Sequence, residues 1–438
     1  MVKNLSYYYR LVAIGVRVIR HEGWHRFWAK FKLWLEQRAA RAQRLRENTR
    51  EASIRMPVLV GYPFVAVGMG EHIRCSWRAF QAVGLTLPLC DIYSGETCLD
   101  TTLQGEFGGH LVQGLSRSIN IFHINGDEAE HVLHHLGCKL PNRARNIVYP
   151  VWELSIYPQE WAKQIDRFDE IWAPSKFVFD SISKAVSKPV FHMPLATEVR
   201  LTTFLGREHF GLPESAYLFL FYFDFRSWIY RKNPFATLKA FDRVCDARPH
   251  VDVRLVIKLN RPADPSPWEK DYPRFMMAIE QSKHKDKVIV IDRVLDDNEV
   301  KNLVRCSDCF ISLHRSEGYG RGLAEAMFLG KPVIATGYGG NLDFMNEMNS
   351  CLVHYKLIAV EKGQYPYTEG QVWAEPDIDH AVYFMLKLLD DRDYGRRLGE
   401  IASRHIRTYF SYRAIGLRYK SRFEEILQQK AGALQLER

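Results

Sequence analysis

The sequence predicts an α/β protein with two doubly wound parallel-sheet domains that face one cleft, preceded by a basic amphipathic helical extension. From Pro57 onward, short β-runs alternate with helix-length segments, which is the rhythm of βαβ units. Residues 194–212 have weak periodicity and divide this alternation into two series. A chain of 438 residues also exceeds one ordinary core. We expect an extension over 1–55, a first domain over 56–200, a second over 201–405 and a final helix over 406–438.

The N-terminal extension carries the charge of the chain. Residues 1–50 contain twelve lysines and arginines against three glutamates, so their net charge of +9 equals that of the whole protein. The remaining residues are close to neutral, which argues against a nucleic-acid groove in the core. Apolar residues, Trp24 and Phe27 among them, recur at helical spacing between the basic ones. Such a helix suits an anionic membrane surface, and packing on the protein itself or on a partner is the alternative.

The first series begins with a strand over Val58–Gly61, a Gly-Met-Gly turn, and a helix over Glu71–Val83. Further β-runs of the first series lie at Ile119–Ile124, Asn146–Tyr149, Glu170–Ala173 and Pro189–Met193. Their short length and β-branched or aromatic content favour strands over helices.

The second series begins with a strand over Tyr217–Phe223. Asn233 followed by Pro234 predicts a helix start, with the asparagine side chain as cap and proline at the first helical position. The stretch from Asp377 to Leu427 is helical with charged faces. Further elements of the second series are strands at Val253–Leu259, Val288–Ile291, Cys309–Leu313 and Pro332–Ala335, and a helix at Arg321–Phe328.

One loop of the second series is suited to an anion. Glycines at 318, 320 and 322 lie between a strand and a helix. Without side chains there, backbone N–H groups can approach a phosphate, and the helix N-terminus adds about half a positive charge. Glu317 and Glu325 bracket the loop. Carboxylates repel phosphate, so they suit the neutral hydroxyls of a sugar and a ribose at the two ends of a sugar–diphosphate–ribose ligand.

This segment resembles the Glu-x7-Glu signature of retaining glycosyltransferases with the GT-B fold, most closely family 4. The resemblance covers about Pro57 to His380 and implies two Rossmann-like domains, with a final helix that crosses back to the first domain. The strings that carry it occur in this order: Gly68-Met69-Gly70-Glu71, Val151-Trp152-Glu153-Leu154, Asp169-Glu170-Ile171-Trp172-Ala173-Pro174-Ser175, Arg231-Lys232-Asn233-Pro234 and Ser312-Leu313-His314-Arg315-Ser316-Glu317-Gly318.

The resemblance implies a donor site in the second domain. Glu325 would accept hydrogen bonds from the donor ribose, although a helical carboxylate paired with Arg321 is the alternative. Glu317 would lie nearer the transferred sugar. The N–H groups of Gly318, Tyr319 and Gly320 would contact the diphosphate and the sugar.

Cations are expected where the leaving diphosphate gains negative charge. The resemblance places Lys232 there most directly, with Arg231 beside it. Arg226 and Lys258 are further candidates for donor binding, and a solvated surface cation is the alternative for each.

The first domain is expected to hold the acceptor. The resemblance places Gly68, Met69 and Glu71 on the acceptor side and Gly70 against the donor phosphate. Three polar residues, His123, Asn125 and Asp127, follow a strand at its carboxyl end, where clefts of open sheets lie. His123 or Asn125 could bind the transferred sugar, and Asp127 could orient or deprotonate the acceptor hydroxyl. A polar loop that satisfies its own turn is the alternative. Trp152 and Glu153 are further cleft candidates.

The expected activity is retaining transfer of a sugar from a nucleotide diphosphate donor to a glycan or lipid-linked acceptor, in surface polysaccharide or lipopolysaccharide biosynthesis. Mannose from GDP-mannose is the first expectation and rhamnose an alternative. A sugar phosphorylase or synthase of the same fold, or a catalytically silent membrane scaffold, are the other classes considered.

No cofactor and no metal are expected, because the acidic run at Asp390-Asp391-Arg392-Asp393 lies in a turn between helices and Cys306 and Cys309 form a lone C-x-x-C. The eight cysteines lack paired spacing, which is typical of reduced thiols. With neither a transmembrane-length apolar run nor a signal peptide, we expect a cytoplasmic protein, peripheral on the inner face of the plasma membrane.

Overall fold

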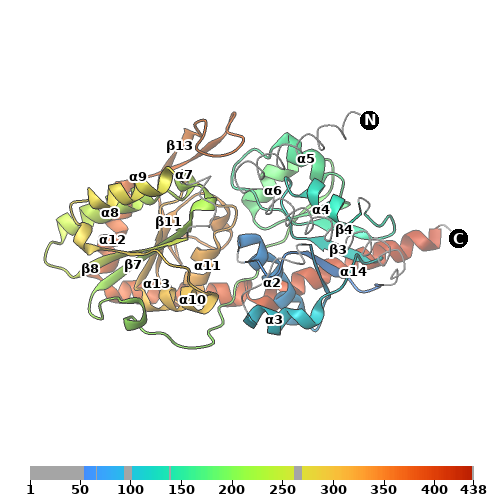
Figure 1. Ribbon diagram of the computed structural model, residues 1–438, viewed down its shortest axis with the longest axis horizontal. Helices are drawn as coiled ribbons and strands as arrows, with labels where there is room; N and C mark the ends of the chain where they lie inside the picture. Colours follow the sequence, from blue (N-terminus) through green and yellow to red (C-terminus); the bar gives the residue numbers. More distant parts are fainter. Residues whose placement is uncertain (1–53, 66, 93–100, 138–139, 261–268, 437–438) are drawn as a thin grey trace, which may run out of the picture.

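The computed structural model describes residues 54–65, 67–92, 101–137, 140–260 and 269–436. The predicted helical extension over 1–55 lies outside these residues except for 54 and 55. The described chain forms two lobes side by side, each with a parallel sheet covered by helices (Figure 1). The predicted α/β class with two doubly wound parallel sheets is therefore confirmed.

The first sheet has six parallel strands in the order β2-β1-β3-β4-β5-β6. Its order reverses next to β1, which is where ligands bind in doubly wound sheets. β2 is three residues long and was not predicted. The strands of the first lobe are β1 (Val58–Gly61), β2 (Leu89–Asp91), β3 (Ile119–Phe122), β4 (Arg145–Val148), β5 (Glu170–Ala173) and β6 (Val190–His192).

The second sheet has the order β12-β11-β10-β7-β8-β9 and is also parallel. β13 (Tyr355–Ala359) and β14 (Val372–Pro376) form a separate antiparallel pair that the sequence did not predict. The strands of the second sheet are β7 (Tyr217–Asp224), β8 (Val253–Asn260), β9 (Val288–Ile291), β10 (Cys309–Ser312), β11 (Val333–Thr336) and β12 (Cys351–Val353).

Helices fill the connections between strands. Those of the first lobe are α2 (Gly68–Gln81), α3 (Thr101–Phe107), α4 (Ala129–His135), α5 (Gln159–Ile165) and α6 (Lys176–Ser183). Those of the second lobe and the C-terminal segment are α7 (Ile229–Lys232), α8 (Pro234–Ala247), α9 (Asp271–Glu280), α10 (Asp297–Cys306), α11 (Arg321–Phe328), α12 (Ile378–Asp390), α13 (Arg392–Tyr409) and α14 (Tyr412–Leu436).

The start of α8 differs from the prediction in one respect. The helix does begin at Pro234, but Asn233 forms no side-chain cap. Asn233 has a left-handed backbone, φ +52°, and its side-chain amide donates to the carbonyl of Leu313, 3.1 Å away. The predicted cap is wrong because the asparagine ties the α7–α8 turn to the end of β10 instead.

α14 leaves the second lobe and runs along the first, where it packs on α2 (Figure 1). Arg422 of α14 forms two hydrogen bonds with buried Glu170 of β5, at 2.9 and 2.8 Å. At Gly416, a Cβ atom would lie 2.1 Å from the carbonyl oxygen of Ala79, so only glycine permits this close approach. The final helix thus fixes the two lobes relative to each other.

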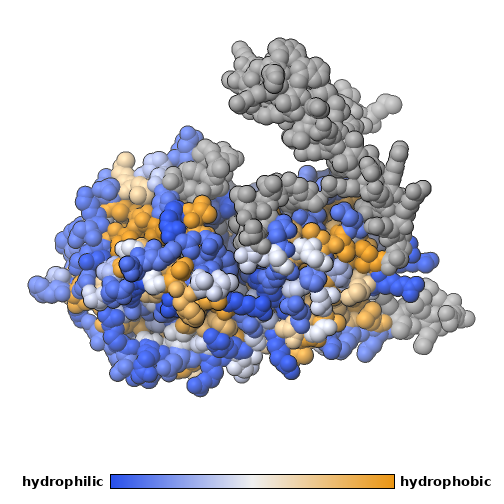
Figure 2. All heavy atoms as spheres, turned by 60° about the horizontal axis from the view of Figure 1, so that its bottom comes forward, coloured by the Kyte–Doolittle hydropathy of each residue, from blue (hydrophilic) through white to orange (hydrophobic). Residues whose placement is uncertain are grey.

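Hydrophilic residues dominate the face shown in Figure 2, and apolar residues gather there in separate patches on both lobes. None of the helices in the described ranges is long and apolar enough to span a membrane.

Candidate active site

The loop between β10 and α11 lies at the junction of the two lobes. Gly320 has φ +91°, a left-handed conformation that favours glycine. Gly318 packs against the first lobe, since a Cβ atom there would lie 2.7 Å from the carbonyl oxygen of Trp152. At Gly322 a Cβ atom would lie 2.4 Å from the Tyr222 hydroxyl. All three glycines are therefore required by close contacts or by backbone conformation.

Both lobes hold this loop in place. The Ser175 hydroxyl, which also caps α6, donates to the carbonyl of Gly318 at 2.6 Å. Ser316 donates to the carbonyl of Glu153, and Gly340 N–H donates to the carbonyl of Glu317 at 2.7 Å. Contacts from both lobes thus fix the position of the loop.

The backbone N–H groups of Gly318, Tyr319 and Gly320 donate no hydrogen bond to any group in the described part of the chain. The side chain of Tyr319 points elsewhere, because its hydroxyl donates to the carbonyl of Leu195 at 2.8 Å. Three neighbouring donors at the N-terminus of an eight-residue helix are suited to a phosphate.

Glu317 lies between two cations. The Lys232 ammonium is paired with Oε1, and Nη1 of Arg231 lies 3.1 Å from Oε2. Burial alone would raise the pKa of Glu317, but Lys232 and Arg231 lower it to about 2. Glu317 is therefore ionised at neutral pH and is a hydrogen-bond acceptor only.

The two cations differ in their freedom. Arg231 is 4% exposed and also donates to the carbonyls of Ser227 and Ser316, at 3.1 and 3.0 Å. It therefore fixes Glu317 and the loop. The Lys232 side chain is 19% exposed, and burial lowers its pKa. Lys232 is the cation of this pair with access to a ligand.

Glu325 lies on the second turn of α11, where the Tyr222 hydroxyl donates to it at 3.3 Å. Burial raises the pKa of Glu325 to about 7, although Lys301 and Arg321 partly oppose this. Arg321 donates instead to the Cys75 thiol of α2, 3.2 Å away, so the helix pairing of Arg321 with Glu325 is not formed.

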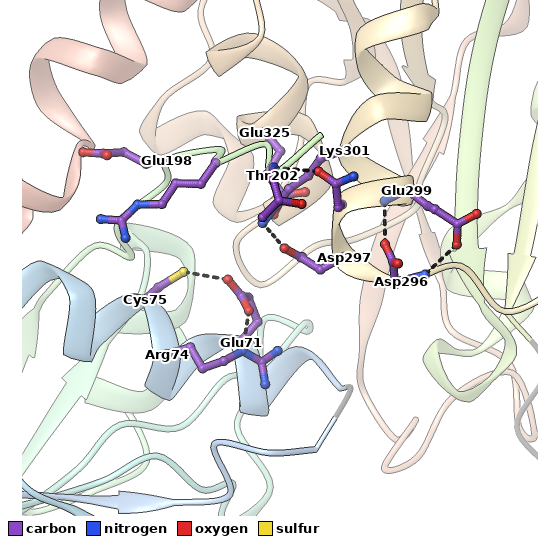
Figure 3. A network of polar contacts seen from close by, with 12 residues as sticks. Glu71, Arg74, Cys75, Glu198, Thr202, Asp296, Asp297, Glu299, Lys301 and Glu325 are labelled. Carbon is purple, nitrogen blue, oxygen red and sulfur yellow. Dashed lines mark hydrogen bonds and ion pairs between the residues drawn. The ribbon is translucent and has the colours of Figure 1, made fainter. Parts of the chain in front are cut away.

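Glu71 of α2 faces α10 and α11 from the other lobe, as Figure 3 shows. It is engaged by its own helix: Arg74 Nε lies 2.6 Å and Arg78 Nη1 3.3 Å from its carboxylate. Burial disfavours the charge, yet these arginines hold the pKa of Glu71 well below its usual range. The Glu71 carboxylate, which was predicted to lie on the side of the sugar acceptor, is thus already paired with Arg74 and Arg78.

Lys301 of α10 is 4% exposed and donates to Asp297 at 2.5 Å (Figure 3). Sequence reasoning missed this buried cation. Its place on the helix that follows β9, near the carboxyl edge of the sheet, was the signal that could have identified it.

The other predicted donor cations lie one and two strands away from β10. Arg226 follows β7 and forms a 2.6 Å ion pair with Asp224, and its side chain is 41% exposed. Lys258 lies near the end of β8, where burial lowers its pKa.

Gly68, Met69 and Gly70 open α2, earlier than the predicted start at Glu71. At Gly70 a Cβ atom would lie 2.1 Å from the carbonyl oxygen of Val65, so the turn is closely packed. His123 is fully buried, and burial lowers its pKa to about 3. Its ring lies 4.9 Å from the buried ring of His72.

The remaining first-lobe candidates have different surroundings. Asn125 accepts from the N–H of Val151 at 3.0 Å, and Asp127 is exposed. Trp152 is 1% exposed, so its indole leaves no open face. Glu153 accepts from the Tyr365 hydroxyl at 2.7 Å and lies 3.8 Å from Arg231.

The structure thus brings Lys232, Arg231, Glu317 and Glu153 together beside the glycine loop. Glu325 lies further along α11, towards α10 and α2. Within the described ranges, no group of three His, Cys, Asp or Glu side chains has an arrangement that could hold a metal ion.

Residues 207–405, just under half of the chain, match the family model described as glycosyl transferases group 1. A comparison of the sequence with curated proteins finds no match.

Several solved structures share the fold. Anabaena HepE, in complex with UDP and glucose, matches with a TM-score of 0.61 at 11% identity, over 84% of this chain and 100% of that one. Sucrose-phosphate synthase from Thermosynechococcus elongatus matches with a TM-score of 0.61 at 13% identity, over 86% of this chain and 100% of that one. A TarM variant from S. aureus, in complex with UDP among other ligands, matches with a TM-score of 0.51 at 12% identity, over 70% of this chain but 55% of that longer one. These likenesses show the GT-B fold.

Proposed function

We propose that the chain is a glycosyltransferase that transfers a sugar from a nucleoside diphosphate to a glycan or lipid-linked acceptor with retention of the anomeric configuration. The match of residues 207–405 to the glycosyl transferases group 1 model and the GT-B fold support this proposal. The observation that supports this most is the loop itself. Three backbone donors, at Gly318, Tyr319 and Gly320, have no partner among the described residues and lie beside the Lys232–Glu317 pair.

In this proposal the diphosphate binds at the N-terminus of α11, with its charge facing Lys232. Cleavage of the bond to the sugar leaves negative charge on the diphosphate, and a cation held in a water-poor site lowers that barrier. Lys232 exchanges its partner Glu317 for the phosphate, while Arg231 keeps Glu317 in place. Glu317 is then free to accept hydrogen bonds from the transferred sugar.

Glu325 would accept from the ribose diol. Its carboxylate lies on the second turn of α11 and is partly buried beside Tyr222. Retention would follow from attack on the face that the diphosphate leaves, with the donor phosphate taking the acceptor proton. The protein cations supply the charge stabilisation, so we propose that no metal is required.

The donor sugar is proposed as a hexose. GDP-mannose and a rhamnosyl donor are the candidates from the sequence, and HepE and TarM, whose structures contain UDP, add UDP-hexoses to the set. Surface polysaccharide, as glycan or lipid-linked oligosaccharide, is the proposed acceptor class.

A donor screen tests the proposal. The full chain is incubated with UDP-glucose, UDP-N-acetylglucosamine, GDP-mannose and dTDP-rhamnose, with and without a saccharide acceptor, and released nucleoside diphosphate is measured. We expect turnover of one donor class, with an anomeric configuration in the product equal to that of the donor. Release of sugar 1-phosphate that depends on inorganic phosphate would instead identify a phosphorylase, and no turnover of any donor would contradict the proposal.

We also propose that residues 1–50 attach the protein to the inner face of the plasma membrane. Their net charge of +9, with aromatic residues at helical spacing, supports this. The fraction of protein that sediments with phosphatidylglycerol vesicles should fall when residues 1–50 are deleted. This difference between the full chain and the deletion variant should be larger at low ionic strength, where charges are less screened. Equal sedimentation of the full chain and the deletion variant would contradict it.

A further inference from the structure

Two exposed aromatic side chains lie at strained backbone positions. In the described chain, three residues other than glycine have positive φ: Trp228 at 62°, Asn233 at 52° and Tyr367 at 54°. Trp228 is 37% and Tyr367 43% exposed. Strain at exposed aromatic residues brings no gain from core packing, and such strain is typical of functional sites.

These two residues belong to one aromatic group built from both lobes. The ring centroid of Trp228 lies 5.7 Å from that of Tyr365, a residue of the loop between β13 and β14. The ring centroid of Tyr365 lies 5.7 Å from that of Trp152. Trp161 of α5 lies 5.0 Å from Trp152 and 5.4 Å from Tyr367. Tyr365 and Trp152 are buried, so they support three rings that remain open or partly open: Trp228, Tyr367 and Trp161.

Polar contacts fix this group in place. The Trp161 indole N–H donates to the Tyr367 hydroxyl at 3.1 Å, and that hydroxyl donates to Glu160 at 3.2 Å. Gln371, at the end of the same loop, donates to the carbonyl of Ile156 at 2.6 Å and accepts from its N–H at 3.1 Å. The loop between β13 and β14 thus bridges the two lobes.

The group adjoins the reacting centre. The carbonyl of Trp228 accepts the N–H of Lys232 at 3.1 Å, and the Tyr365 hydroxyl donates to Glu153, which lies 3.8 Å from Arg231. Figure 1 shows α7 and the β13 hairpin together at the rim between the lobes. Glu325 lies on the second turn of α11, facing α10 and α2 (Figure 3). The aromatic group is therefore at the end of the site that bears Glu317.

We propose that Trp228, Tyr367 and Trp161 form a platform that binds the saccharide chain of the acceptor. The inference rests on the proposed function, since it assigns the acceptor of that reaction. Sugar rings present flat faces of C–H groups, which stack on aromatic rings, and rims of hydroxyls, which donate to carboxylates such as Glu160. A chain of two or more sugars would span the platform while its terminal hydroxyl reaches the donor.

The test is a set of variants assayed with gluco- and manno-oligosaccharides of one to four sugars. Trp228→Gly removes one ring and relieves the strained backbone, and Trp161→Ala removes another from the opposite lobe. Tyr383→Ala, which removes a 54% exposed ring of α12, is the matched control. For both platform variants, the KM for tri- and tetrasaccharides should rise about tenfold, as the loss of one stacking contact implies. For Trp161→Ala, the KM for the monosaccharide and for the nucleotide sugar should stay near that of the wild type.

Saccharide binding without donor separates this inference from the proposed function. Titration of wild-type tryptophan fluorescence with the tetrasaccharides should show binding that Trp228→Gly and Trp161→Ala weaken, even if no donor is turned over. Thermal melts show whether each variant is folded. Because the two substitutions lie in different lobes, the other variant still tests the proposal if one of them does not fold. Unchanged affinity for every oligosaccharide in both folded variants overturns the proposal. So does a loss of binding to phosphatidylglycerol vesicles with unchanged saccharide affinity, because the surface would then contact lipid.

Discussion

Replacing Lys232 by alanine should lower turnover far more than it lowers stability. The Lys232 ammonium is paired with Glu317, and the Lys232 side chain is 19% exposed. Arg231, 3.1 Å from the other carboxylate oxygen, remains in the variant. Because Glu317 keeps this buried partner, we expect Lys232→Ala to fold.

The expected loss of rate follows from Coulomb's law. A unit cation about 4 Å from a phosphate oxygen, at an effective dielectric constant of about 20, interacts by about 4 kcal/mol. Part of this attraction already acts in the ground state, so the loss specific to the transition state is about 3 kcal/mol, a decrease in kcat of about 150-fold. The KM for the donor should change less, since charge on the leaving group grows mainly during bond cleavage.

The assay is steady-state release of nucleoside diphosphate at saturating donor, with a thermal melt of each protein. Lys176→Ala is the control: this lysine is 61% exposed in a surface pair with Asp180, and its loss should leave kcat unchanged. Lys232→Arg keeps the charge but not the geometry and should recover part of the rate. A folded Lys232→Ala enzyme with wild-type kcat would refute a role for this cation in the reaction.

Three further predictions concern pH, stability and packing. The pKa of Glu325 is raised to about 7, so it is protonated below that pH; donor KM should fall as pH rises through about 7, and Glu325→Gln should abolish this dependence. Arg422→Ala removes one of the two arginines paired with buried Glu170 and leaves Arg145 at 3.0 Å, so it should lower the free energy of unfolding in urea by about 1.5–3 kcal/mol, whereas exposed Arg413→Ala should change it little. Gly318→Ala places a Cβ 2.7 Å from the carbonyl oxygen of Trp152, so donor affinity measured by calorimetry should fall, and unchanged affinity would contradict the tight packing of this loop.

Much of the fold was predictable because its signals are local. The β-runs at Val58–Gly61, Glu170–Ala173 and Val288–Ile291 coincide with β1, β5 and β9, since buried parallel strands are short apolar stretches. β2, β12 and the β13–β14 pair were missed. β2 has three residues, and the exposed pattern of β13 lacks the alternation that marks a strand packed on a core.

The sequence predicted which residues lie in the site, but not which side chains form hydrogen bonds and ion pairs with one another. The spacing of Glu317 and Glu325 and the glycines between them are visible in the sequence, because local turn chemistry requires them. The difference between Arg231, buried behind Glu317, and its neighbour Lys232 arises from the turn of α7, which follows strained Trp228. The engagement of Glu71 by Arg74 depends on side-chain geometry that spacing alone leaves open.

Isothermal titration of nucleotide sugars into the wild type and Glu325→Ala tests the central claim, a donor site on the loop and first turns of α11. The donor identified by the screen should bind to the wild type with one molecule per chain. In Glu325→Ala, with a melting temperature close to that of the wild type, its affinity should fall by about tenfold or more, because the ribose loses its acceptor. Equal affinity for the two proteins, or binding of no nucleotide sugar to the wild type, would contradict this account of the site.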